Sequence, residues 1–242
     1  MKLRRFLLGG GLLVVTAVFL SACGLLQEPE AASAPIEAVP LVIETPTAAA
    51  ASDTAIADTG TTATGPVIFQ IDPAQSQVRF ELDEDLRGSR ITVVGTTNQV
   101  AGELAVDLSN PTATQVGIIQ INARTLATDN NFRNRAIQNE ILDTGAYEFI
   151  TFTPTAVTGL PESVNVDDPV TFTIAGNLTI RDVTNAVTFT VQATAVSATQ
   201  LTGTATATVS RGDYGLQIPS VPNVANVEEE VELIIDFVAN AS

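Results

Sequence analysis

Residues 170–191 read VTFTIAGNLTIRDVTNAVTFTV, and they contain two runs in which apolar residues alternate with threonine. The apolar members are Val170, Phe172 and Ile174 in the first run and Val187, Phe189 and Val191 in the second. A polar break at residues 182–185 separates the two runs. A period of two with β-branched residues on both faces is typical of antiparallel strands that have one dry and one wet face. The stretch therefore predicts two strands joined by a turn.

The same alternation continues on both sides of this stretch. Its apolar members are Val78, Phe80 and Leu82 before the stretch, and Ala205, Ala207, Val209, Val231, Leu233, Ile235 and Phe237 after it. Turn-rich breaks at residues 108–111, 165–169 and 210–214 separate these runs. Residues 66–240 are therefore predicted to form one all-β domain, which is long enough to bury a single closed core.

One segment of the domain lacks the alternation. Residues 128–131 have the composition of a helix N-cap, and the apolar residues that follow fall on one helical stripe: Phe132, Ala136, Ile137, Ile141 and Leu142. This pattern predicts a single short helix over residues 131–142, which we expect to cross one end of the β structure.

The charge of the chain excludes several classes of partner. Residues 1–22 carry three of the 11 basic residues and none of the 27 acidic ones, so the remaining chain has a formal charge of −19. Such a chain repels phosphate backbones, which argues against nucleic-acid binding. It also argues against electrostatic attraction to anionic lipid surfaces. Contact with a membrane is expected to depend on a covalent anchor.

The composition also argues against catalysis and against a resident metal or cofactor. The chain has no histidine and a single cysteine, Cys23, which excludes Ser-His-Asp triads, Cys-His dyads and zinc sites of the usual kind. A carboxylate hydrolase is a weighed alternative, with candidate runs at residues 83–85, 167–168 and 228–230. Neighbouring residues of a strand point to opposite faces, however, so these carboxylates do not converge on one atom. We expect no enzymatic activity.

The N-terminus has the features of a bacterial lipoprotein export signal. A basic start is followed by an apolar stretch over residues 6–20, which is shorter than the roughly 20 residues that a membrane-spanning helix needs. Leu20, Ser21, Ala22 and Cys23 then form the pattern of a lipobox. Residues 1–22 are predicted to be a lipoprotein signal peptide, with the mature chain starting at a lipidated Cys23. The alternative is ordinary cleavage that leaves an idle thiol.

Residues 23–65 differ from the domain in amino-acid composition. They are dominated by Ala, Thr, Pro and Glu, and they contain neither an aromatic residue nor a sustained apolar period. This composition is typical of a disordered tether. About 40 flexible residues would give the domain a mean reach of roughly 35 Å from the membrane.

Five fragments in the domain, in this order, resemble the YceI-like family. They are residues 71–73 with Ser76, Val78 and Phe80; residues 121–130 with Arg133; residues 147–152; residues 174–180 with Val183 and Thr184; and residues 211–216. The chain departs from the family pattern at Arg181 and Asp182, where a His-Gly pair is usual, and in the longer stretches 81–100 and 219–230. These departures fall at turns and near a possible barrel mouth.

The resemblance implies an extended eight-stranded antiparallel barrel of lipocalin-like shape, whose lumen holds an isoprenoid or similar lipid chain. Residues predicted to line that lumen are Val78, Phe80, Leu82, Ile150, Phe152, Phe172, Ile174, Leu178, Ile180, Val187, Phe189, Val191, Leu233, Ile235 and Phe237. Small inward residues such as Ala205 and Ala207 would leave volume for a ligand. The alternative is that the same residues pack a tapered core.

Two arginines on the predicted helix are candidates for contact with a ligand headgroup. Arg133 and Arg135 could bind a pyrophosphate or quinone head, because guanidinium groups suit phosphate oxygens. The alternative is a solvated helix face or ion pairs with Glu140 and Asp143. Arg211 and Asp213 are expected to form a structural pair.

The sequence therefore predicts a membrane-anchored lipid-binding protein outside the cytoplasm. It would hold a polyprenyl or quinone chain for storage, transport or stress protection, with an apolar lipid as ligand and the membrane reached through the anchor. The anchor is expected on the outer face of the cell membrane, or in the periplasm or outer membrane of a cell that has one. The alternative function is a ligand-free structural or interaction module of the cell envelope.

Overall fold

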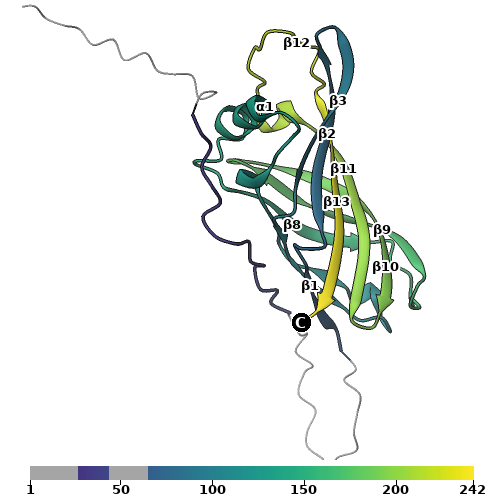
Figure 1. Ribbon diagram of the computed structural model, residues 1–242. Coiled ribbons are helices and arrows are strands. Elements are labelled where there is room, and N and C mark those ends of the chain that lie inside the picture. The colour runs from purple at the N-terminus through teal and green to yellow at the C-terminus, as the bar shows by residue number, and fades with distance from the viewer. Residues whose placement is uncertain (1–26, 44–64) are drawn as a thin grey trace, which may run out of the picture.

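The computed structural model describes residues 27–43 and 65–242. Thirteen strands form one antiparallel sheet (Figure 1). The strands are β1 (Val67–Ile71), β2 (Gln77–Leu86), β3 (Ser89–Thr97), β4 (Val100–Ala101), β5 (Glu103–Val106), β6 (Gln115–Val116), β7 (Ile119–Asn122), β8 (Phe149–Thr158), β9 (Pro169–Ile180), β10 (Val183–Ser197), β11 (Gln200–Ser210), β12 (Val224–Ala225) and β13 (Glu230–Ala241). The helical segments are η2 (Pro111–Ala113), η3 (Ala123–Thr125), α1 (Asn131–Ala136), η4 (Ile137–Ile141) and η5 (Arg211–Tyr214).

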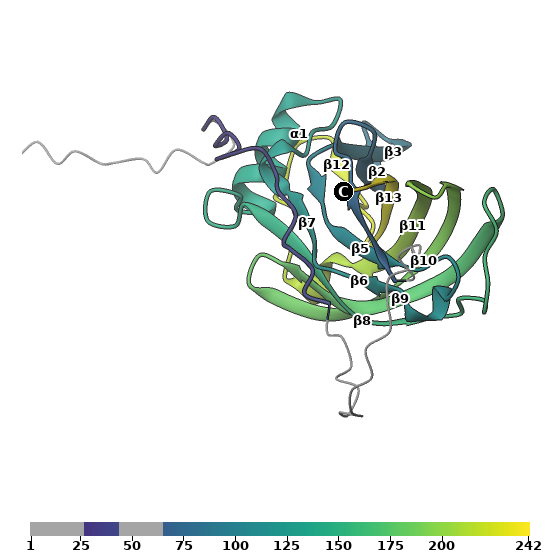
Figure 2. The same ribbon diagram turned by 90° about the horizontal axis from the view of Figure 1, so that it is seen from below.

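Short strands that follow each other closely are pieces of longer bent strands. β1 and β2 both pair with β13, while β3, β4 and β5 follow one another and pair with β2, β7 and β1 respectively. If β1 is joined to β2, β3 to β4 and β5, and β6 to β7, these three bent strands and β8, β9, β10, β11 and β13 make eight. The circle closes where β13 meets β2 and where β4 meets β7. Figure 2 shows the strong curl of the sheet from below. The predicted eight-stranded antiparallel barrel is confirmed.

The two strands predicted from residues 170–191 are β9 and β10. They pair antiparallel, with Phe172 opposite Val191 and Ile174 opposite Phe189. Ile174, Phe189 and Val191 are buried. Both strands run well beyond the alternating residues, and the inward positions Leu178 and Ile180 in the extension of β9 are also buried.

The long stretch 81–100 forms a hairpin that extends past the barrel. β2 and β3 pair from Val78 to Leu86 and turn at Arg87 and Gly88, which both have positive φ. Positive φ at both positions matches the twist of a two-residue hairpin. β12 pairs with the end of β2, so this hairpin and the loop of residues 216–229 stand together beside α1 (Figure 1).

The predicted helix is present and lies across one end of the barrel (Figure 1). The Asn130 side chain accepts hydrogen bonds from the backbone N–H groups of Phe132 and Arg133, which caps α1. The second half of the predicted helix is the π-helical turn η4. Ala136, Ile137 and Leu142 are buried as expected, but Phe132 of the same stripe is 68% exposed. Phe132 lies in the first turn of α1, at the exposed end of the stripe.

Residues 27–43 contain no helix or strand, and they follow the outside of the barrel (Figures 1 and 2). The predicted signal peptide and Cys23 lie outside the described residues. None of the helices in the described ranges has the length and apolar character needed to cross a bilayer.

Candidate functional site

A cavity of about 320 Å³ lies at the end of the barrel that α1 covers. Its walls come from β2 and β3, from α1 and η4, from the ends of β8, β9, β11 and β13, and from the loop after η5. The apolar lining consists of Phe80, Leu82, Leu86, Val93, Leu126, Phe132, Ala136, Ile137, Ile141, Leu142, Ile150, Ile180, Val209, Leu216, Ile218, Pro219, Val221, Pro222, Val224, Val227, Val231 and Leu233. The volume is near the lower end of the range, roughly 300–1,000 Å³, that is usual for small-molecule sites.

The predicted lumen residues separate by depth along the barrel. Phe80, Leu82, Ile150, Ile180 and Leu233 line the cavity. The rest belong to the packed core beneath it: Val78, Phe152, Ile174, Leu178, Phe189 and Val191 are buried there, and Phe172, Val187, Ile235 and Phe237 pack against them. The inside of the barrel is therefore open near α1 and filled further down.

Aromatic rings fill the barrel interior away from the cavity. The rings of Phe152 and Phe189 meet edge to face, with their centroids 4.9 Å apart. A Cβ added at Gly176 would lie 2.6 Å from the Phe152 ring, and one added at Gly203 would lie 2.7 Å from Phe237. These rings occupy the space that the glycines leave, so the small residues of the lower barrel are matched by large ones and leave no lumen there.

The loop of residues 216–229 supplies much of the lining that the predicted set omitted. It contributes Leu216, Ile218, Pro219, Val221, Pro222, Val224 and Val227. Pairing of Val224 with Leu86, and a hydrogen bond from the Arg87 N–H to the Asn223 carbonyl at 2.8 Å, fold this loop over the cavity. These lining residues could have been suspected from the sequence, because residues 219–230 are longer than the family pattern and rich in apolar residues.

Arg211 holds one end of this loop. Its guanidinium contacts Glu229 at 2.9 Å and donates to the carbonyls of Glu228 and Leu216 at 3.0 and 3.2 Å. Hydrogen bonds from Ser210 and from the Gly212 backbone, together with the charge of Arg211, hold the pKa of Glu229 below its usual range. The expected structural pair of Arg211 with Asp213 is not formed, because η5 directs the guanidinium toward the returning loop instead.

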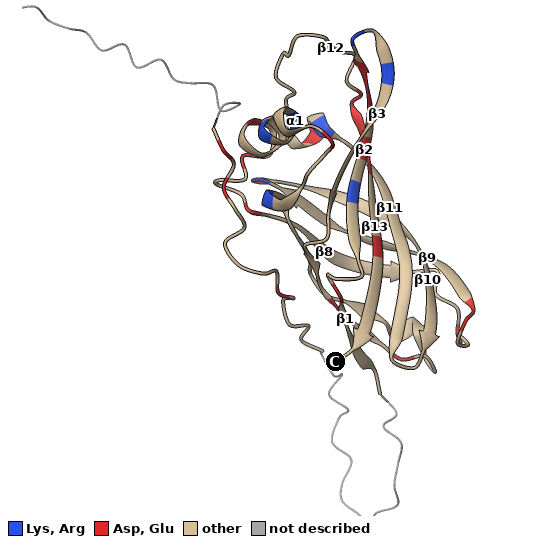
Figure 3. Cartoon of the chain, viewed as in Figure 1, with Lys and Arg blue, Asp and Glu red and all other residues tan. Residues whose placement is uncertain are grey.

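One buried ion pair lines the cavity. Arg133 of α1 contacts Glu84 of β2 at 2.8 Å, and their side chains are 17% and 8% exposed. Glu84 faces inward because it follows Phe80 and Leu82 on the same side of β2. Arg133 also contacts the exposed Asp129 at 2.7 Å. Figure 3 shows how charged residues gather around α1 and the β2–β3 hairpin.

The two predicted headgroup arginines have different positions. Arg133 lies in the cavity wall, and its carboxylate partners are Glu84 and Asp129 rather than the Glu140 and Asp143 considered for the alternative. Arg135 is half-buried and does not line the cavity. Residues two positions apart in an α-helix are rotated by about 200° around the helix axis. The side chains of Arg133 and Arg135 therefore lie on nearly opposite sides of α1.

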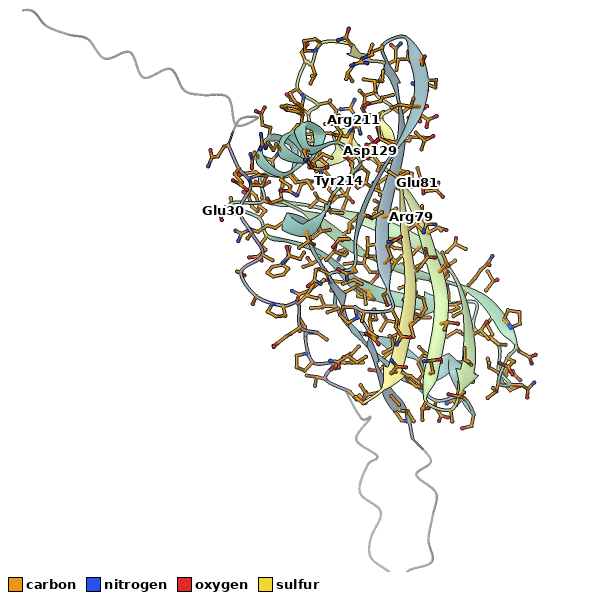
Figure 4. All side chains as sticks on the ribbon, in the orientation of Figure 1. Glu30, Arg79, Glu81, Asp129, Arg211 and Tyr214 are labelled. Atoms are coloured by element: carbon orange, nitrogen blue, oxygen red, sulfur yellow. The ribbon has the colours of Figure 1, made fainter. Side chains whose placement is uncertain are left out.

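Among the described residues that line the cavity, Tyr214 has a buried hydroxyl group without a hydrogen-bond partner. Its side chain is 2% exposed, and its hydroxyl has no hydrogen-bond partner among the described residues. Burial and the nearby charge of Asp213 raise the pKa of Tyr214; the Asn185 amide offsets this only in part and donates to the Asp213 carbonyl. Tyr214 and Arg211 both lie close to α1 (Figure 4). The site can thus enclose an apolar chain, and the Tyr214 hydroxyl is buried behind its lining.

Residues 69–239 of this chain match the family model of the YceI-like domain. UPF0312 proteins of Shewanella sp. strains ANA-3 and MR-7 are each 32% identical to this chain over 156 residues, which cover 60% of this chain and 74% of each relative.

Solved structures share the fold. A polyisoprenoid binding domain from Saccharophagus degradans, implicated in plant cell wall breakdown, covers 73% of this chain and 99% of its own, with a TM-score of 0.59 and 13% identity. BcnA of Burkholderia cenocepacia covers 70% of this chain and 99% of its own, with a TM-score of 0.56 and 18% identity. At these identities the likeness shows the fold alone.

Proposed function

Because the chain belongs to the YceI-like domain family, we propose that it binds an isoprenoid-type lipid in the cavity under α1 and is anchored to a membrane by a lipid on Cys23. The family is one of binding proteins and not of enzymes, in agreement with the sequence prediction. A structural relative is described as a polyisoprenoid binding domain, which supports an apolar lipid as the ligand class.

The observation that carries the proposal is the contrast between the open and filled halves of the barrel. Side chains pack against one another in the filled half, and the open half exposes apolar walls to a cavity of about 320 Å³. Each CH₂ group transferred from water into such a cavity contributes about 0.8 kcal/mol before the costs of association. A volume of about 320 Å³ suits one end of a long chain rather than its whole length.

The anchor is proposed from the lipobox at residues 20–23 and the apolar stretch before it. Stable attachment needs more than one acyl chain, which a modified cysteine supplies. The cellular place follows from the anchor: the outer face of the cell membrane, or the periplasmic side of a membrane in a cell that has two. In this place the protein would store or carry its lipid beside the bilayer.

The lipid content of the purified protein tests the proposal. The mature chain is isolated from its native host in mild detergent, and its co-purifying lipids are identified by mass spectrometry. Leu82→Trp is the blocking variant, because Leu82 lines the cavity but lies outside the tightly packed core. Val94→Trp on the same hairpin is the control, because Val94 is 39% exposed.

An isoprenoid-type lipid is expected with the natural chain and with Val94→Trp, and much less of it with Leu82→Trp. An empty natural chain that also takes up no added polyprenyl lipid would overturn the proposal. It would favour the alternative of a ligand-free envelope module.

A further inference from the structure

The N-terminal strap, defined as residues 27–43, is bound to the barrel at several points. The Asn139 amide donates to the Gln27 carbonyl at 2.8 Å. Arg124 contacts Glu30 at 2.9 Å and donates to the Ala31 carbonyl at 3.2 Å. Further along, the Leu41 N–H donates to Glu103 at 2.7 Å. A segment with the composition of a free tether therefore follows a defined path along the domain.

The firmest point of the strap is a partly buried network around Glu148. The Ser33 N–H donates to Glu148 at 2.8 Å, and the same carboxylate accepts from the Asn122 side chain at 2.9 Å and contacts Arg124 at 3.2 Å. The side chains of Glu148 and Arg124 are both 12% exposed. The Ser33 hydrogen bond is itself exposed, but its acceptor is an ionised carboxylate held in place by Asn122 and Arg124, and charge-assisted hydrogen bonds are stronger than neutral ones. This network can therefore hold a segment without regular structure.

The strap runs from the cavity end of the barrel toward the opposite end. Gln27 is bound to Asn139 of η4, which forms part of the cavity wall, whereas Leu41 is bound to Glu103 of β5 near β1 (Figure 1). Glu30 lies at the height of Tyr214 along the barrel (Figure 4). The end of the strap that leads to Cys23 is thus the end at the cavity.

This direction limits where the anchor can be. Cys23 precedes Gln27 by four residues, and four residues span at most about 14 Å. We infer that the strap holds the anchor beside the cavity mouth and turns that mouth toward the bilayer that carries the anchor. The inference rests on the proposed lipidation of Cys23. It replaces the free reach of roughly 35 Å, expected for a flexible tether, with a fixed orientation.

The rim of the mouth is suited to contact with lipid. Phe132 is 68% exposed and Val221 is 36% exposed, and they belong to the two elements, α1 and the loop after η5, that border the cavity. Acidic Asp129 and Glu228, which are 87% and 47% exposed, flank this apolar rim. Anionic headgroups would repel these carboxylates. The rim is therefore expected to touch an uncharged or zwitterionic surface weakly, with the anchor supplying the affinity.

Fluorescence quenching in vesicles tests the orientation. The natural chain contains no tryptophan, so each introduced tryptophan is a single reporter. Phe132→Trp places it at the mouth, and Val196→Trp places it near the opposite end of β10, where Val196 is 41% exposed. The full lipidated chain is reconstituted in phosphatidylcholine vesicles that contain phosphatidylcholine with brominated acyl chains.

Quenching is expected to be stronger at position 132 than at position 196. Glu30→Gln combined with Ser33→Pro releases the strap, because the first change removes an ion pair and the second removes the N–H that binds Glu148. Neither residue belongs to the barrel. Release is expected to abolish the difference between the two reporters.

Equal quenching at the two positions in the natural strap, or a difference that survives its release, would overturn the inference. Failure of the chain to attach to vesicles, with an unmodified Cys23 by mass spectrometry, would overturn it together with the anchor. Lipid extracted from the same preparations separates this result from ligand binding. A loaded barrel with equal quenching refutes only the orientation, and an empty barrel with selective quenching refutes only the ligand.

Discussion

Arg133 and Glu84 join α1 to β2 across the wall of the cavity, with their charged atoms 2.8 Å apart. Glu84 lies on the inward and otherwise apolar face of β2, where an unpaired carboxylate would be costly. The pair therefore does two things at once. It neutralises an inward charge, and it fixes the helix that covers the open half of the barrel.

Removal of either partner is expected to destabilise the protein. Glu84→Ala leaves a partly buried Arg133 and should lower the free energy of unfolding by about 3 kcal/mol, the lower end for a broken buried pair. Asp129→Ala removes the exposed partner of the same arginine and should cost less than about 1 kcal/mol. Urea unfolding of both variants measures the difference. Equal losses would show that the Glu84 contact has no special weight.

Phe80 and Gly95 form a cross-strand pair in which the ring lies over the glycine. A Cβ at position 95 would lie 2.2 Å from Phe80 Cε1, so Gly95→Ala must push the ring toward the cavity. We expect a loss of about 1–3 kcal/mol, together with weaker lipid retention. Gly145→Ala is the control, because a Cβ added at position 145 would lie 3.8 Å from its nearest contact, the Glu30 carboxyl group. Thermal unfolding and extracted lipid give the two readouts, and an unchanged Gly95→Ala protein would contradict the packing described.

Tyr214→Phe is expected to separate stability from ligand recognition. The hydroxyl is buried without a partner, so its removal should raise the stability of the empty barrel by up to about 1 kcal/mol. Because the hydroxyl is not exposed to the cavity, the same change should leave the ratio of the affinities for a lipid alcohol and for the matching hydrocarbon unchanged. Calorimetric unfolding and a competition assay with the two lipids measure these effects. A selective loss of affinity for the alcohol would contradict this prediction.

The strap is expected to loosen in acid. Burial by itself raises the pKa of Glu148, but hydrogen bonds from Ser33 and Asn122 and the charge of Arg124 outweigh it and leave this pKa lowered. A lowered folded-state pKa means that the contact stabilises fully above the ordinary carboxylate range near pH 4 and is lost as the pH falls through the lowered pKa. Hydrogen exchange at the Ser33 amide should therefore show protection at neutral pH that declines in acid. In Glu148→Gln this pH dependence should disappear, and its persistence would point to another carboxylate.

The strand content of this protein could be predicted from local pattern because it depends on a local rule. Side chains of a strand alternate between two faces, so Phe172, Ile174 and Phe189 had to lie on one side of the sheet wherever the sheet went. The helix was predictable for the same kind of reason, since Asn130 caps α1 through hydrogen bonds within three residues.

The position of each inward residue along the barrel axis, which decides whether it lines the cavity, could not be predicted in this way. Leu178 and Ile180 lie on the same face of β9 and both are buried in the core, yet of the two only Ile180 lines the cavity. Leu178 lies opposite Phe152 of β8, whose ring packs against Phe189. The cavity roof likewise needed the pairing of Val224 with Leu86, which are far apart in the chain.

Local patterns are enough to predict an all-β domain, the dry face of each strand, the capped helix and the family, because these follow from side-chain periodicity and from short motifs. The tertiary structure adds where the barrel is open, which residues line the opening, and at which end of the barrel the strap begins. Those properties depend on contacts between distant residues, such as Arg133 with Glu84 and Ser33 with Glu148, which no local pattern encodes.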